Sequence, residues 1–207
     1  MQNMSQDSTH TKRNLIILDF DGVINASKYA YAVKTDNHWD GVYDVETLHI
    51  DEKPFTIYYS PELVSVINSW GQRDDTDIIW VTTWATNTKQ FTKLGFNKFE
   101  EATPEYDDDI PYGHLWKPRI GSSLIENSNY EKYVWVDDDE TINGPYKKWP
   151  SQVQDKFLRV NPMSDFGMTR EDTNLIEEYL GFYPGVHDGG YCGLFFTRLS
   201  LMLKGCT

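Results

Sequence analysis

Four short apolar runs recur along the chain at wide intervals. Residues 15–18 form an unbroken run, 77–83 and 133–136 repeat the pattern, and 157–160 is a weaker fourth run. Short continuous apolar runs separated by helical stretches are typical of strands that are buried on both faces. We therefore predict an α/β fold built on a doubly wound parallel sheet.

Helix start and stop signals lie between and after these runs. Ser and Thr favour the N-cap, Pro favours the first turn, and Gly favours the end of a helix. The predicted helices run from Ser60 to Gly71, over 86–94, over 121–128, and from Thr169 to Gly181. The inward faces of the first and last are predicted to carry Leu63, Ile67, Trp70, Leu175, Ile176 and Tyr179.

Residues 26–59 do not fit this alternation. The segment is rich in aromatic and turn residues, and Val42–Leu48 and Phe55–Tyr59 are predicted to pair as a hairpin that covers the edge of the sheet as a flap. The stretch 99–116 is predicted to be an acidic loop. The aromatic side chains of the flap either stack on a substrate base or form its hydrophobic underside. They are Tyr29, Tyr31, Trp39, Tyr43, Tyr58 and Tyr59.

The 207 residues suffice for one well-buried domain with a small cover. We predict a disordered tail over 1–13, a catalytic domain over 14–181, and a C-terminal extension over 182–207 whose role the sequence leaves open. No segment has the apolar length of a membrane span, and the N-terminus lacks the apolar stretch of a signal peptide. Only Cys192 and Cys206 occur, too few for a disulfide framework, so a cytoplasmic location is expected.

The formal net charge of −13 bears on the choice of partners. A polyanion is repelled by such a field unless a local basic patch overrides it, which argues against tight non-specific binding to long nucleic acid. A phosphorylated small molecule or a nucleic-acid end stays open as a ligand, because a metal and one lysine can dominate locally. The oligomeric state is also left open.

Polar residues suited to phosphoryl chemistry follow three of the apolar runs. In a parallel α/β sheet, ligands bind at the carboxyl ends of the strands, so these residues are expected to meet in one crevice. They are Asp19 and Asp21 after the first run, Thr82 and Thr83 at the second, and Asp137, Asp138 and Asp139 after the third.

The segment after the first run, Asp-Phe-Asp-Gly-Val-Ile-Asn from Asp19 to Asn25, is the most informative. Acids two residues apart at a strand end can converge on one Mg²⁺ ion, which prefers oxygen ligands. Gly22 lets the backbone turn tightly and leaves amide groups to meet a phosphate. The segment therefore predicts a site for a metal and a phosphate together.

This segment resembles the first motif of the haloacid dehalogenase (HAD) superfamily, Asp-x-Asp-Gly after a buried strand. The resemblance implies that Asp19 attacks phosphorus and forms an aspartyl-phosphate. It also implies that Asp21 protonates the leaving oxygen and later deprotonates the attacking water. A dehalogenase proper lacks the second acid, so Asp21 favours phosphate chemistry over carbon–halogen cleavage.

The other motifs of the superfamily occur in the expected order. Thr82 matches the second-motif residue that hydrogen-bonds the phosphoryl group, with Thr83 as the fallback if the strand ends one residue later. Lys117 matches the third-motif lysine, which neutralises the nucleophile and the phosphate. Val-Trp-Val-Asp-Asp over 134–138 matches the fourth motif, a buried strand that ends in paired acids.

The resemblance further implies two ligand sets. Asp137 is expected to ligate Mg²⁺ directly and Asp138 directly or through water, whereas Asp139 is expected to be solvated. The implied metal ligands are Asp19, Asp21, Asp137 and Asp138. The residues implied to bind phosphate are Phe20, Gly22, Thr82, Thr83 and Lys117.

A narrower resemblance extends to compact phage and bacterial members of the superfamily, such as the domain of "Swiss army knife" RNA-repair proteins. It rests on 81–84, 135–138 and 166–169. The chain is thus predicted to be a Mg²⁺-dependent phosphohydrolase, with a nucleotide or nucleic-acid end among its candidate substrates. A receiver-like phospho-acceptor and a non-catalytic phosphate-binding module are the alternatives. In a receiver the lysine follows the other site residues, whereas Lys117 precedes Asp137.

Overall fold

The computed structural model of the protein describes residues 14–27, 39, 43–50, 52–102, 116–138 and 157–182. Its centre is a five-stranded sheet in the order β5-β4-β1-β6-β7, in which all neighbouring strands run parallel. The strands are β1 (Asn14–Leu18), β4 (Thr76–Trp80), β5 (Glu100–Glu101), β6 (Lys132–Val136) and β7 (Phe157–Val160). The predicted α/β fold is confirmed.

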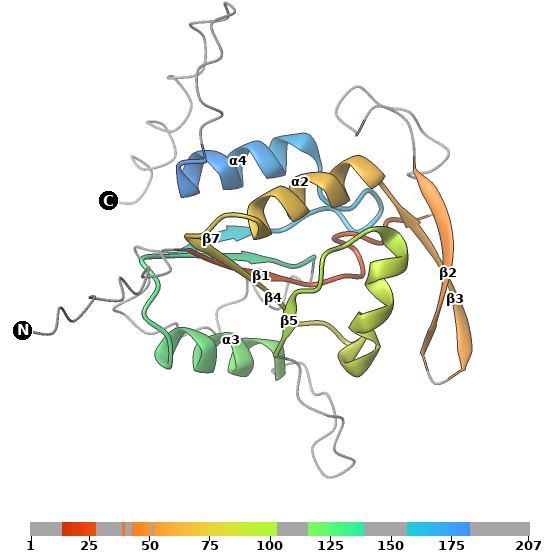
Figure 1. Ribbon diagram of the computed structural model, residues 1–207, viewed down its shortest axis with the longest axis horizontal. Helices are drawn as coiled ribbons and strands as arrows, with labels where there is room; N and C mark the ends of the chain where they lie inside the picture. Colours follow the sequence, from red (N-terminus) through yellow and green to blue (C-terminus); the bar gives the residue numbers. More distant parts are fainter. Residues whose placement is uncertain are drawn as a thin grey trace, which may run out of the picture.

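Helices cover both faces of this sheet. Figure 1 shows α2 (Pro61–Gly71) and α4 (Arg170–Leu180) together on one face and α3 (Trp116–Glu126) on the other. Alternate residues of β1 accordingly enter two separate cores, with Ile16 on the α2 and α4 side and Ile17 on the α3 side. Burial on both faces explains why the strands read as unbroken apolar runs.

The hairpin stands beside the sheet next to the 3₁₀ helix η1 (Ala85–Leu94) (Figure 1). It consists of β2 (Asp44–Ile50) and β3 (Lys53–Tyr59), paired antiparallel. Leu48 and Ile57 are fully buried in the main core. Trp39 and Tyr59 belong to the same core, and they are 2% and 8% exposed, respectively. These aromatic residues form the underside of the flap. Tyr29 and Tyr31 lie outside the described residues.

The cap signals predict the starts of α2 and α4 correctly. The Ser60 hydroxyl accepts a hydrogen bond from the Leu63 amide at 3.2 Å. Thr169 and Asp172 form a reciprocal capping box, and Gly181 ends α4 in the left-handed region at φ 78°. These contacts satisfy amide and carbonyl groups that the helix ends leave unpaired.

The predicted bounds of the first helix agree with α2, which ends at Gly71 with Gln72 as the C-cap residue; a side chain at Gly71 would meet the ring of Phe99. The predicted inward face of the last helix is wrong in part. Leu175 does not face inward, since it is 38% exposed. The buried stripe of α4 is Thr173, Ile176 and Leu180, three and four residues apart, with Tyr179 packed against its margin.

Two elements were not predicted in the right place. The third helix begins at Trp116 and not at residue 121 as predicted, so Lys117 lies in its first turn. Strand β5 lies inside the stretch predicted as an acidic loop and pairs with β4 through Glu100 and Glu101. Two acidic residues give no apolar periodicity from which a strand could be predicted.

Several predictions fall on residues outside the described ranges. These include the N-terminal tail, Asp139, both cysteines and the C-terminal extension from residue 183. Among the helices that the structure describes, none combines the length and hydrophobicity needed to cross a membrane. The cytoplasmic location stays a prediction.

Candidate active site

The site is built at the carboxyl ends of three adjacent strands. The amide of Asp19 donates to the carbonyl of Val136 on β6, and the amide of Val81 donates to the carbonyl of Leu18 on β1. These two bonds continue the sheet by one residue beyond each strand end. They bring the residues that follow β1, β4 and β6 to the same edge, as the sequence pattern predicts.

Asp19 lies at the centre of this edge and is only 5% exposed. Its carboxylate accepts a 2.5 Å hydrogen bond from the ammonium group of Lys117, and it is also hydrogen-bonded by the Phe20 amide and the Thr82 hydroxyl. Burial raises the pKa of Asp19 above its usual value, and Lys117 with the two other donors offsets part of that rise. The donors therefore hold one buried carboxylate in a defined orientation.

Lys117 bridges two acids. Its Nζ lies 2.5 Å from Oδ2 of Asp19 and 3.1 Å from Oδ2 of Asp137. Burial by itself lowers the pKa of a lysine, but the charges of Asp19 and Asp137 outweigh it and raise the pKa of Lys117 well above its ordinary value. Lys117 therefore stays cationic and is available to face a phosphate.

Asp138 completes an acidic cluster with Asp19 and Asp137. Each of the three residues offers one carboxylate oxygen, and these oxygens lie within 4.8 Å of one another. Asp19 and Asp137 are buried, and Asp138 is half-buried. One lysine cannot balance three acids at such distances, and hard oxygen donors in this arrangement suit a divalent cation such as Mg²⁺.

The Asp21 side chain lies outside this cluster. It is exposed to solvent, and each of its oxygens accepts one hydrogen bond: Oδ1 from Nδ2 of Asn25 at 2.7 Å and Oδ2 from the indole Nε1 of Trp84 at 2.9 Å. Asp21 was predicted to bind the metal together with Asp19, Asp137 and Asp138. Its carboxylate does not converge with the other three.

The two adjacent threonines have different positions. Thr82 is fully buried and hydrogen-bonds Asp19, whereas Thr83 is exposed. Strand β4 ends at Trp80, so the chain reaches the site two residues later, at Thr82. This geometry favours Thr82 over Thr83 as the second-motif residue.

Two backbone amides of the first motif form hydrogen bonds within the motif itself. The Phe20 amide hydrogen-bonds the Asp19 carboxylate, and the Gly22 amide donates to the carbonyl of Asn25 at 3.0 Å. Gly22, which was expected to leave its amide to a phosphate, instead uses that amide to close the turn, at φ 71°. The Phe20 ring is buried and stacks on Phe91 with centroids 3.9 Å apart.

Sequence reasoning missed Asn25 and Trp84 as residues of the site. Asn25 follows Asp21 by four residues within a turn, a position from which an amide can reach back to a carboxylate. Trp84 is buried, and a buried indole N–H usually finds a hydrogen-bond partner. Both signals are present in the sequence, but neither identifies its partner without the fold.

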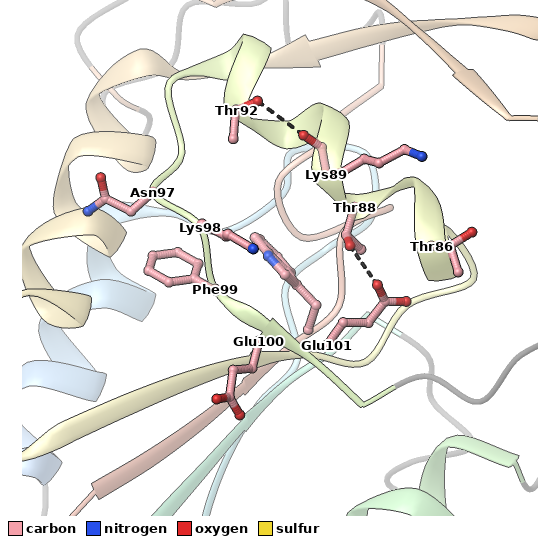
Figure 2. A pocket seen from close by; sticks show the side chains of 10 residues that line it. Thr86, Thr88, Lys89, Thr92, Asn97, Lys98, Phe99, Glu100 and Glu101 are labelled. Atoms are coloured by element: carbon pink, nitrogen blue, oxygen red, sulfur yellow. Dashed lines mark hydrogen bonds between the residues drawn. The ribbon is translucent and has the colours of Figure 1, made fainter.

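A separate pocket of about 470 Å³ lies where η1 meets β5, and Figure 2 shows the side chains around it. None of its lining residues belongs to the acidic cluster. The lining combines two lysines with two acids, and Thr88 donates to Glu101 at 2.7 Å across it. This balance of charges points to no particular ligand. The residues are Trp80, Thr86, Thr88, Lys89, Thr92, Asn97, Lys98, Phe99, Glu100 and Glu101.

Comparison with known families identifies a family that matches the chain. The family described as "HAD domain in Swiss Army Knife RNA repair proteins" matches residues 15–173, well over half of the chain. The matched region runs from β1 into the first turn of α4 and contains all three residues of the acidic cluster. No curated protein matches the chain significantly.

Proposed function

The chain belongs to the family of HAD domains in Swiss Army Knife RNA repair proteins, and on that premise we propose that it is a Mg²⁺-dependent phosphohydrolase acting on a phosphomonoester through an aspartyl-phosphate on Asp19. The observation that carries the proposal is the contact between Asp19 and Lys117 beside two further acids. A carboxylate oriented by a lysine and a hydroxyl is suited to attack phosphorus.

The reaction divides into two displacements. In the first, an Asp19 oxygen forms a bond to phosphorus while the bond to the leaving oxygen breaks, and Asp21 gives that oxygen a proton. In the second, a water molecule loses a proton to Asp21 and attacks the phosphorus of the aspartyl-phosphate. The Asp19–phosphorus bond breaks and inorganic phosphate leaves. Lys117 opposes the negative charge that gathers around Asp19 in both steps.

The metal is assigned to the acidic cluster. Asp19, Asp137 and Asp138 would hold Mg²⁺, because their oxygens converge and their charges exceed that of Lys117. When bound, the ion supplies charge neutralisation for the phosphoryl oxygens. The Asp21 carboxylate accepts hydrogen bonds from Asn25 and Trp84 and is not grouped with the three converging acids, so it is not among the proposed metal ligands.

The substrate is proposed to be a nucleotide or a nucleic-acid end. The description of the matched family names RNA repair, and the short hairpin is the one cover that the described residues place near the site. The net charge of −13 limits the contact to the terminal part of a nucleic acid, since a long polyanion would be repelled. A receiver-like role is disfavoured by the family match and by the position of Lys117 before Asp137.

A phosphatase assay tests this proposal. Purified protein with Mg²⁺ is offered p-nitrophenyl phosphate, nucleotides, phosphosugars, and oligonucleotides phosphorylated at the 3′ or 5′ end. We expect turnover that falls by a factor on the order of 10³ or more in Asp19→Asn, because the nucleophile is lost. Asp74→Asn, an exposed acid outside the site, is the matched control and should retain full activity. Full activity of Asp19→Asn would refute the assignment of the nucleophile.

A further inference from the structure

The Asp21 carboxylate is held by two donors, one on each oxygen. The Trp84 indole N–H donates to Oδ2 at 2.9 Å, and the Asn25 side-chain amide donates to Oδ1 at 2.7 Å. An exposed aspartate usually samples several rotamers. Two donors on opposite oxygens fix both the position of this carboxylate and the plane in which it lies.

The indole that donates to Asp21 is itself immobilised. Trp84 is 1% exposed, and its ring packs edge-on against Phe20 with centroids 5.2 Å apart. The ring is tilted against that of Phe91, with centroids 5.6 Å apart. Phe20 is the residue between Asp19 and Asp21 in the chain. The direction of the Trp84 N–H is therefore set by the same aromatic cluster that anchors the first motif.

Both donors also contact strand β3 of the hairpin. The Asn25 side-chain oxygen accepts from the Tyr58 amide at 3.1 Å, and the neighbouring Ala26 amide donates to the Tyr58 carbonyl at 2.8 Å. The Trp84 ring meets the ring of Phe55 edge-on at 5.8 Å. One strand thus supports Asp21 from two directions, through Asn25 and through Trp84.

We infer that Trp84 and Asn25 are positioning residues that hold the Asp21 carboxyl group for proton transfer to the leaving oxygen, and that strand β3 supports both. The inference rests on the proposed phosphohydrolase function and adds to it. It makes the hairpin a structural support of the acid–base group as well as a cover. Proton transfer by a side chain requires hydrogen-bond reach of the reacting atom, so a loosely held Asp21 would transfer its proton less often.

A pair of substrates with different leaving groups tests the inference. Phenyl phosphate needs a proton on its leaving oxygen, whereas 2,4-dinitrophenyl phosphate releases a stable anion. The quantity measured is the ratio of kcat/KM for phenyl phosphate to that for 2,4-dinitrophenyl phosphate. Because kcat/KM covers the steps up to formation of the aspartyl-phosphate, the later attack of water does not enter this ratio.

Trp84→Phe removes the donor and keeps an aromatic ring in the cluster. We expect the ratio to fall by a factor on the order of 10 or more, because proton transfer typically contributes a factor of about 10² to 10⁴. Trp70→Phe is the matched control: Trp70 is equally buried and donates to Glu177 at the same 2.9 Å, away from the site. Its ratio should equal that of the wild type.

Asn25→Ala provides a second variant in case Trp84→Phe fails to fold, and it should lower the ratio in the same way. An unchanged ratio in a folded Trp84→Phe or Asn25→Ala protein overturns the inference, since equal losses on both substrates indicate a purely structural role. Absence of wild-type hydrolysis of both esters is a different result, which overturns the proposed function itself.

Discussion

The carboxylate of Asp138 occupies the space into which a side chain at Gly22 would project. Gly22 also has a φ of 71°, a left-handed conformation that side chains disfavour. The turn after the first motif and the acid that follows β6 are therefore packed directly against each other. Any residue larger than glycine at this position must displace one member of the acidic cluster.

Gly22→Ala is predicted to impair the site beyond its cost in stability. The left-handed strain of an alanine costs about 1 to 2 kcal/mol, and displacement of Asp138 weakens the metal site as well. We expect activity to fall at least about tenfold at limiting Mg²⁺, since one converging oxygen is lost. Gly181→Ala is the control, because Gly181 has a φ of 78° and open space around it. If both variants show the same activity and the same Mg²⁺ dependence, the close packing of Gly22 against Asp138 does not contribute to function, and the prediction is wrong.

Mg²⁺ is predicted to raise the melting temperature of the protein through the acidic cluster. A ligand that binds the folded state alone stabilises it by about 2.7 kcal/mol at a concentration of 100 times its Kd. Asp138→Asn should reduce the Mg²⁺-induced shift, because it removes one charged oxygen from the three that converge. Differential scanning fluorimetry with and without Mg²⁺ measures the effect, and Asp74→Asn should respond like the wild type. An identical response in Asp138→Asn would exclude that residue from the metal site.

Lys117→Met is predicted to destabilise the metal-free protein. The substitution leaves Asp19 and Asp137 buried without the cation that lies between them. Breaking a buried pair in this way typically costs about 3 to 5 kcal/mol. Chemical denaturation gives the free energy of unfolding, and Lys89→Met, an exposed lysine on η1, should change it little. Mg²⁺ should restore more stability to Lys117→Met than to the wild type. An equal effect of Mg²⁺ on the two proteins would contradict the account in which Mg²⁺ and Lys117 neutralise the same acids.

The sheet and most of its helices could be predicted because their signals are local. Apolar runs marked four of the five parallel strands, and cap residues such as Ser60 and Thr169 marked the helix starts. The position of Lys117 could not be predicted in the same way. Its helix begins at Trp116 with Pro118 in the first turn, a signal that favours a helix start, whereas the helix was predicted to begin only at residue 121.

The convergence of Asp19, Thr82 and Asp137 followed from one topological rule, because parallel strands end at the same edge. The support of Asp21 did not follow from any such rule. It depends on a tryptophan 63 residues away and on a hairpin whose place beside η1 is set by tertiary packing. Local patterns therefore predicted the reacting groups, and the fold was needed to show what holds them.

Peptide mapping of acid-quenched protein measures whether Asp19 carries the phosphoryl group. The protein is mixed with Mg²⁺ and p-nitrophenyl phosphate, quenched during turnover, and reduced with borohydride, which converts an aspartyl-phosphate to homoserine. The expected result is homoserine at position 19 in the wild type and none in Asp19→Asn. Turnover without modification at Asp19, or with modification at another acid, would contradict the assignment of Asp19 as the nucleophile.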